Sequence, residues 1–339
     1  MPTTEELFAQ AYLHPGDEAP KQVLADRLLE DGDARGEFIA LQLRHEKGGL
    51  PPSGVKREKR LLDENEVKWL GSTARKVIGH TTRWRHGFLD VCGATLDGTT
   101  VGSLEWSTVR ELSLYNTDTM RPEELSADFR SLQVLQRANT NALDVLVKAR
   151  EKPPIRSLSY GGPTRHLREW APRGVDSLLK LAELPYLKEL RLMPPSAQDL
   201  NGKDFAFFFD SMLARKLEQL TVTVIRPGVR GFPTPIDLVS FVRGAEGLPL
   251  VAYTVEVQGL VSYRFEHSVL TVTVLTRPSM TGDALPVMMR SLRGLDPKSV
   301  ERFELVYPGK RLAKRHLSPV EEAAKRFSKV NAVEYRSAP

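Results

Sequence analysis

The chain has 339 residues, enough for one elongated domain or two compact ones, and its 41% hydrophobic content is that of a folded protein with a core. The single cysteine, Cys92, excludes an intramolecular disulfide and any zinc site built on cysteines. The net charge of +5 is modest. Residues 1–10 carry two Glu and no Lys or Arg, unlike a signal peptide, and no apolar run reaches the ~18 residues of a membrane span. We therefore expect a cytoplasmic protein without a membrane partner.

The first 46 residues predict three short helices. The first spans Glu5–Tyr12 and ends at His14–Gly16. Apolar residues then recur at helical spacing over Val23–Leu29, until Asp31–Asp33 breaks the pattern as a turn would. A third helix follows, with its entry at Ala34–Glu37. A module of this size is too small to fold alone, which is consistent with a cap on the segment behind it.

The run LADRLLEDGDARGEFIALQ, residues 24–42, resembles the bacterial repeat-companion domain, as do Leu7, Ala11, Pro15, Asp17, Ala19 and Pro20. The resemblance covers about residues 3–45 and continues more weakly to residue 91, through Arg57–Gly71 and Trp84–Asp90. One departure is Arg27, where the family usually has Trp. The resemblance implies an N-terminal module that precedes leucine-rich-repeat-like segments. It implies no activity and no catalytic residue.

The predicted domains are a helical cap at 1–46, a linker at 47–55 and a repeat segment at 56–337. The linker, KGGLPPSGV, is expected to lack regular structure because it holds three Gly and two Pro. Helix is expected to resume over Arg57–Leu70, whose apolar side is formed by Leu61, Leu62, Val67, Trp69 and Leu70. Trp69 and Trp84 are interpreted as packing anchors.

A repeat of three apolar positions, spaced by three and then two residues, runs through the rest of the chain. Each copy predicts a short strand, because its last two apolar positions alternate with polar ones. The copies are Val109/Leu112/Leu114, Ile155/Leu158/Tyr160, Leu187/Leu190/Leu192, Leu217/Leu220/Val222, Leu250/Tyr253/Val255, Val269/Val272/Val274, Val300/Phe303/Leu305 and Val330/Val333/Tyr335. Leu132/Leu135/Arg137 is an imperfect copy and Phe88/Val91 an opening half-copy.

The intervals between copies are mostly 23 to 33 residues, which leaves room for a crossover helix between parallel strands. Helices are predicted at Val175–Leu184, Asp204–Leu213, Asp283–Leu292 and Pro319–Phe327. The short interval before Val269 instead predicts an antiparallel strand within Leu260–His267. The predicted fold class is α/β, a leucine-rich-repeat-like solenoid with an N-terminal helical cap. It should be irregular, because the Asn usual in such repeats is missing from every copy.

Residues that flank the middle apolar position of each copy should form the open face of the repeat sheet. We therefore predict a non-catalytic scaffold or adaptor that binds another protein through this face, because solenoids present extended surfaces of this kind. The predicted partner-binding residues are Glu111, Ser113, Tyr115, Glu189, Arg191, Met193, Gln219, Thr221, Thr223, Thr254 and Glu256. The sequence does not identify the partner.

Two basic stretches, residues 44–85 and 290–329, support an alternative function. The first holds eleven Lys and Arg against five acids, which would suit nucleic acid or another polyanion. The segment Lys310–His316 in the second stretch has no interleaved aromatic residue, which disfavours single-stranded nucleic acid.

A third alternative is an enzyme whose site is assembled from dispersed residues. The seven His residues are scattered, and the sequence contains no HExxH, GxSxG or phosphate-binding Walker loop. We predict no catalytic residue, no cofactor and no metal site.

Overall fold

The computed structural model describes residues 2–96, 103–115, 129–161, 178–193, 206–224, 238–257, 261–267, 269–275, 291–295, 302–307 and 335–337. The chain divides into two compact units. Unit 1 comprises residues 1–158 and 183–186, and unit 2 comprises residues 159–182 and 187–339. Both units combine helices with strands, so the predicted mixed α/β class is confirmed.

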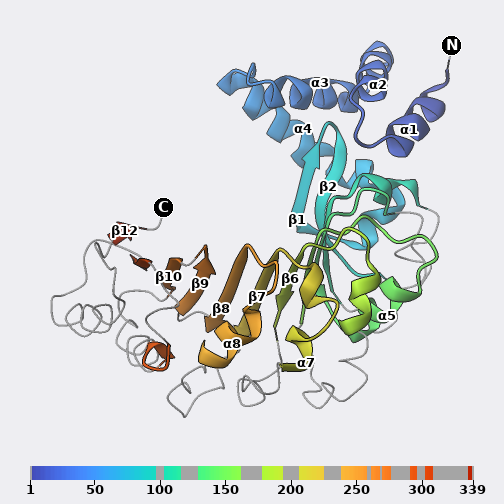
Figure 1. The fold of residues 1–339 in the computed structure, drawn as a ribbon. Helices are drawn as coiled ribbons and strands as arrows, with labels where there is room; N and C mark the ends of the chain where they lie inside the picture. The colour runs from blue at the N-terminus through green and yellow to red at the C-terminus, as the bar shows by residue number, and fades with distance from the viewer. Residues whose placement is uncertain are drawn as a thin grey trace. The chain divides into compact units, whose positions relative to one another are not determined.

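Four helices open unit 1 (Figure 1). The first three confirm the three short helices predicted for the first 46 residues. They are α1 (Thr4–Leu13), α2 (Ala19–Glu30), α3 (Ala34–Glu46) and α4 (Pro52–Leu70). Thr3 and Glu6 form a capping box at the start of α1, and Asp33 caps α3. Helix α4 begins inside the expected linker, because proline is compatible with the first turn of a helix. The prediction that residues 52–55 lack regular structure was therefore wrong.

Glycine at position 36 lets α3 lie directly against α2. A Cβ atom on Gly36 would lie 2.7 Å from the carbonyl oxygen of Ala25 and 2.9 Å from the Cβ of Leu28. These distances are shorter than van der Waals contact, so no larger residue fits between the two backbones. The close packing of α2 against α3 thus explains why the segment RGEFI has glycine at this position.

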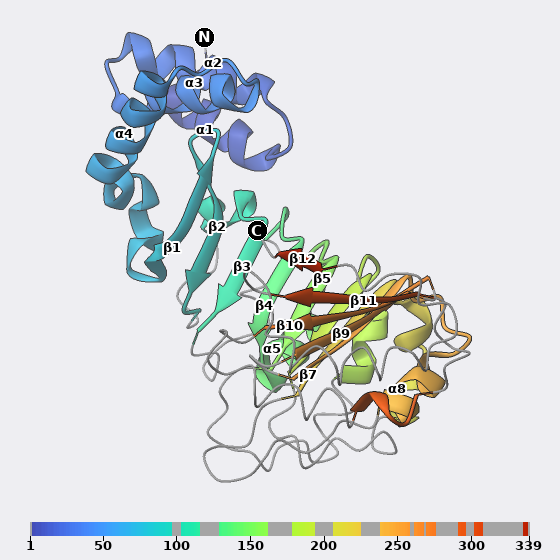
Figure 2. The same ribbon diagram turned by 90° about the vertical axis from the view of Figure 1, so that its left-hand side faces the viewer.

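The strands of unit 1 are hydrogen-bonded in chain order (Figure 2). The first two pair antiparallel, and the next two add in parallel. They are β1 (Val77–Arg85), β2 (Phe88–Ala94), β3 (Glu111–Leu114) and β4 (Val134–Ala138), accompanied by the 3-10 helices η1 (Gly71–Arg75) and η2 (Leu104–Thr108) and by helix α5 (Thr140–Lys148). Strands β2, β3 and β4 coincide with predicted copies, whereas β1 and α5 were not predicted.

Strand β5 (Ser157–Tyr160) lies at the boundary of the units, and seven further strands belong to unit 2. These are β6 (Glu189–Leu192), β7 (Gln219–Val224), β8 (Ala252–Val257), β9 (Val261–Glu266), β10 (Val269–Val274), β11 (Arg302–Tyr307) and β12 (Tyr335–Ser337). Strand β9 pairs antiparallel with both β8 and β10, while the other pairs in unit 2 are parallel. The antiparallel strand predicted within Leu260–His267 is confirmed.

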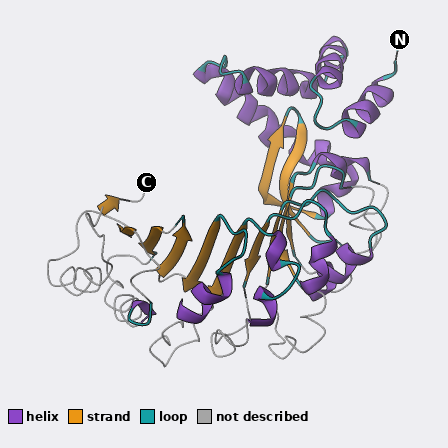
Figure 3. Cartoon of the chain, in the orientation of Figure 1, coloured by secondary structure: helices purple, strands orange, loops and turns teal. Residues whose placement is uncertain are grey.

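The described helical segments of unit 2 are short. They include η4 (Leu181–Glu183, at the unit boundary), α7 (Ala206–Phe209), η6 (Ala214–Lys216) and α8 (Leu238–Ala245). Residues 178–180 and 291–292 are helical as well. Helix α7 ends before the predicted boundary at Leu213, where Ser211 accepts a hydrogen bond from the backbone of Ala214 in a turn. Phe209 contacts Tyr253 of β8 with ring centroids 6.4 Å apart, so α7 covers the apolar side of the strands (Figure 3). Residues 175–177, 283–290 and 319–327 of the predicted helices lie outside the described residues.

Two groups of apolar side chains hold the helices of unit 1 to the β1–β2 hairpin. The first joins Leu7, Ala11, Tyr12, Leu24, Ala25, Leu28, Ile39, Leu43 and Phe88. The second is an aromatic cluster in which Trp69 contacts both Phe38 and Trp84, with ring centroids 4.8 and 6.0 Å apart. The two tryptophans are therefore packing anchors, as predicted. Val67 is 75% exposed, so its predicted place on the apolar side of α4 was wrong: that side contains Leu61, Trp69 and Leu70.

Candidate interaction surface

Strand register in unit 2 assembles eight of the predicted partner-binding residues on one side of the sheet. Glu189 pairs with Gln219, Arg191 with Thr221, and Thr221 with Thr254. The alternate positions Leu190, Leu220 and Tyr253 are buried on the opposite side. We call the polar side the unit 2 polar face; it consists of Glu189, Arg191, Met193, Gln219, Thr221, Thr223, Thr254 and Glu256.

Two charged side chains on this face, Arg191 and Glu256, are paired with each other. Arg191 donates through Nη2 to Glu256 Oε2 at 3.0 Å and through Nε to Thr223 Oγ1 at 3.3 Å. Glu189, Arg191 and Gln219 are exposed, whereas Thr223 and Thr254 are only 1% and 9% exposed. The expectation that all the flanking residues lie open was therefore wrong for these two threonines: Arg191 contacts Thr223, and Thr254 lies between the paired strands β7 and β9. The accessible chemistry of the face comes from Glu189, Arg191 and Gln219.

The other three predicted residues lie in unit 1, on and just after β3. Gln136 of β4 donates to Glu111 at 2.6 Å and accepts from Ser113 at 3.3 Å. The guanidinium carbon of Arg137 lies 4.1 Å from the centre of the Tyr115 ring. All three predicted side chains are half-buried under these neighbours.

Strand β9 contributes polar residues that sequence reasoning did not assign to a site. Arg264 pairs in register with Thr254 and Thr271, so it continues the row that begins at Arg191. It forms an ion pair with Glu266 at 2.9 Å. The segment LVSYRFEH could have indicated that these residues lie on the polar face. If it is a strand, Arg264 and Glu266 alternate with Tyr263 and Phe265 and point to the opposite side of the sheet from them.

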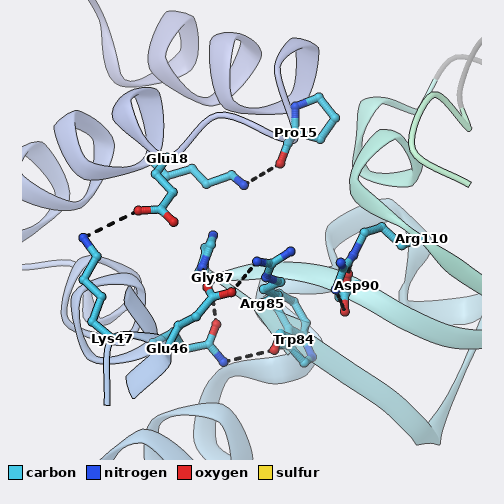
Figure 4. Close-up of polar contacts among 12 residues, drawn as sticks. Pro15, Glu18, Glu46, Lys47, Trp84, Arg85, Gly87, Asp90 and Arg110 are labelled. Carbon is cyan, nitrogen blue, oxygen red and sulfur yellow. Dashed lines mark hydrogen bonds and ion pairs between the residues drawn. The ribbon is translucent and has the colours of Figure 1, made fainter. Parts of the chain in front are cut away.

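A second polar region lies where α3 meets the tip of the β1–β2 hairpin. Arg35 donates to the Gly87 carbonyl at 3.2 Å through Nε and 3.1 Å through Nη2. Gln42 donates to the Trp84 carbonyl at 3.2 Å and accepts from the Gly87 amide at 2.8 Å. Since these side chains are seven residues apart on one helix, they share a face and hold both strands of the turn. Figure 4 shows the hydrogen bond that ends at the Trp84 carbonyl, beside Glu46 and Arg85.

Glu46, eleven residues after Arg35, completes this row on α3. Its carboxylate accepts hydrogen bonds from Arg85 and His86, at the end of β1 and in the turn. Arg85, and then His86, lower the pKa of the Glu46 carboxyl to about 2. Burial lowers the pKa of the His86 imidazole, which favours the neutral ring at neutral pH. We call Arg35, Gln42 and Glu46 the hairpin clamp.

Three residues at this junction could offer ligands to a metal ion. One ligand atom from each of Glu18, Glu46 and His86 lies within 4.8 Å of the other two. Two of these groups are already engaged, since Glu18 pairs with Lys47 at 3.6 Å and Glu46 pairs with Arg85. A cation would have to displace these ion pairs, so the local charge disfavours a metal site.

The basic stretch 44–85 is largely neutralised by acids of unit 1. At least six of its eleven basic side chains form ion pairs with described residues. Arg57, for example, donates to Glu37 from both Nε and Nη2 at 2.8 and 2.6 Å. These pairs weaken the case for a polyanion site along this stretch, because counterion release requires cations that are free to contact phosphates. Most of the second stretch, 290–329, lies outside the described residues.

Among the residues described, no helix combines the length and apolar character needed to span a bilayer. Searches of protein-family models, curated proteins and solved structures found no match to this chain.

Proposed function

We propose that the chain is a non-catalytic protein-interaction scaffold of the cytoplasm, which binds another protein through the unit 2 polar face. In this proposal the helices of residues 1–46 are a repeat-companion cap, and the parallel strands behind them form an irregular leucine-rich-repeat-like solenoid. Stacked repeats of this kind present extended surfaces to partners.

One observation carries the proposal: exposed residues of both charges lie on β6, in register with polar residues of the parallel strand β7. Glu189 and Gln219 form one exposed pair, and Arg191 lies two residues further along β6. The opposite side of the same strands is buried and apolar, so among the described residues it is Glu189, Arg191 and Gln219 of the polar face that are available to a partner. Opposite charges at fixed positions give register and specificity to a protein interface.

A charge swap tests this assignment without removing an ion pair. In the double variant Arg191→Glu/Glu256→Arg the 3.0 Å pair is retained with its polarity reversed. We expect the free energy of unfolding to change by less than about 1 kcal/mol, because the pair is partly exposed. Affinity capture from native lysate after nuclease treatment should recover a stoichiometric protein with the wild type and lose it with the swap.

The matched control is Arg60→Glu/Glu64→Arg, which reverses an exposed pair on α4, in unit 1. This control should retain the captured protein. If both double variants captured the protein equally well, the unit 2 polar face would be an ordinary solvent-exposed surface and not the binding site. Recovery of nuclease-sensitive material alone would favour the polyanion alternative.

A further inference from the structure

Unit 1 contains a hollow of about 670 Å³ that takes no part in the proposed scaffold surface. Side chains from α1, α3, α4 and η2 line it, which makes it a junction of elements far apart in the sequence. Phe8, Tyr12 and Trp69 supply aromatic walls. Its volume lies within the range of small-molecule sites, which combine apolar walls with a few polar groups, although this hollow is shallow and open to solvent.

A buried cation faces this hollow. Arg35 lines it and is only 8% exposed. Its side chain makes hydrogen bonds to the Gly87 carbonyl and the Tyr12 hydroxyl, and it lies over the rings of Phe8 and Phe88. Within the described residues no carboxylate lies within 4 Å of its guanidinium. A buried positive charge without a counter-ion is costly, and an incoming anionic group would relieve that cost.

Two carboxylates line the same hollow. Neither Glu5 nor Glu105 forms an ion pair with a described residue, although Glu105 accepts a hydrogen bond from Ser103. The other cation in the lining, Lys68, is already paired with Asp33 at 3.5 Å. Burial raises the pKa of the Tyr12 phenol, while Arg35 lowers it and Glu105 raises it, so both charges act on the same hydroxyl.

We propose that this hollow binds a zwitterion with an aromatic body, namely a free aromatic amino acid. Its carboxylate would meet Arg35, its ammonium group would meet Glu105 or Glu5, and its ring would lie among Phe8, Tyr12 and Trp69. A polyanion is disfavoured because the two glutamates repel it. An uncharged apolar molecule would leave all three charges unmatched.

The test is calorimetric titration of the full chain with L-phenylalanine, phenylalaninamide, N-acetylphenylalanine and phenylalanyl-glycine. The amide lacks the carboxylate and the acetyl derivative lacks the ammonium group. Each should bind at least about tenfold more weakly than L-phenylalanine, because each loses a charge-assisted hydrogen bond. Phenylalanyl-glycine keeps both charges but carries its carboxylate one residue further from the ring, so it should also bind more weakly than phenylalanine.

Substitution of Arg35 is a poor test, since this side chain also holds the hairpin turn and its loss could prevent folding. Glu105→Gln keeps the acceptor for Ser103 and removes only the charge. We expect it to weaken phenylalanine several-fold and to leave N-acetylphenylalanine unchanged. Glu64→Gln, outside the hollow, is the control and should change neither. Absence of saturable binding by phenylalanine, equal or tighter binding of the blocked ligands or the dipeptide, or no effect of Glu105→Gln would each overturn the proposal.

Discussion

The two-residue turn at the tip of the β1–β2 hairpin shows how single residues fix unit 1. Arg85 pairs with Phe88, so His86 and Gly87 form the turn, and both have positive φ, 52° and 79°. Turns of this kind match the twist of a hairpin, and they favour glycine. A Cβ at position 87 would also lie 2.1 Å from Cγ1 of Ile39. Glycine is thus required here for both conformation and space.

Gly87→Ala should therefore lower the free energy of unfolding by roughly 2–4 kcal/mol, from left-handed strain plus overpacking against Ile39. Urea unfolding measures this loss. Gly32→Ala is a matched control, because Gly32 has φ of 71° but no atom within 4 Å of the added Cβ. It should cost only the strain, about 1–2 kcal/mol. Equal losses in the two variants would show that contact with Ile39 is unimportant.

The clamp residue Glu46 predicts a specific dependence of stability on pH. Its folded-state pKa of about 2 lies below the ordinary value of 4.5, so the ionised carboxylate stabilises the fold at neutral pH. That contribution is complete above the unfolded pKa and is lost as pH falls from 4.5 towards 2. The charged groups around it are Arg85, His86, Lys21, the Glu18–Lys47 pair and the Asp90–Arg110 pair.

Glu46→Gln should therefore be less stable than the wild type by a constant amount above about pH 5.5, with the difference closing as pH falls through 4.5 towards 2. Urea unfolding across this pH range provides the measurement. Glu64→Gln, which removes an exposed carboxylate paired with Arg60, should differ from the wild type by less than about 0.5 kcal/mol throughout. If the wild type were still more stable than Glu46→Gln by the same free energy of unfolding at pH 2, this account of the clamp would be contradicted.

Residue-level exposure was the least predictable property. Val23 and Leu29 fit a helical apolar pattern but are 52% and 47% exposed, because α2 packs against its neighbours through Leu24, Ala25 and Leu28. The clamp was also not predicted, since it depends on a hairpin that begins at the unpredicted strand β1. Spacing along the chain could not indicate that Gln42 contacts a carbonyl 42 residues away.

At the scale of elements, strand positions followed directly from the repeat of apolar residues. Copies such as Leu217/Leu220/Val222 coincide with strands because the alternation of apolar and polar positions and the presence of strand-forming residues both favour a strand there. Strand β1 escaped prediction because its pairing is irregular: its register with β2 shifts between Ile78 and Arg83. Such a bulge disrupts the period-two pattern, and it also makes an edge strand less able to pair with other chains.

The element-scale prediction concerns α1–α3. Deletion of residues 1–46 would uncover Phe88, Trp84 and the hairpin backbone now held by Arg35 and Gln42. We expect the remaining chain to aggregate or to be sharply destabilised, as judged by gel filtration and thermal unfolding. A milder version compares Ile39→Glu, at a fully buried site, with Leu29→Glu, at a half-exposed one. The first should lower stability by several kcal/mol and the second should be tolerated. A soluble, stably folded chain without residues 1–46 would identify them as an independent adaptor.

At the scale of the whole molecule, many of the charged side chains that the structure describes are paired with an opposite charge nearby. The basic stretch of unit 1 pairs with Glu37, Asp33 and Glu18, and in unit 2 Arg191 pairs with Glu256. Composition indicated the uneven distribution of charge along the sequence but not these pairs, which join residues up to 65 positions apart. The candidate surface was predictable as a set of alternating positions; the burial of Thr223 and Thr254 within it depends on neighbouring strands.

The most direct test of the scaffold proposal places a photo-crosslinking amino acid at position 219, an exposed site on the unit 2 polar face, and at position 64 as an exposed control on α4. After irradiation in native lysate and nuclease treatment, we expect one protein to be crosslinked at position 219 and not at position 64. Crosslinks to the same proteins at both positions, or to nucleic acid alone, would contradict the assignment of this face as a protein-binding surface.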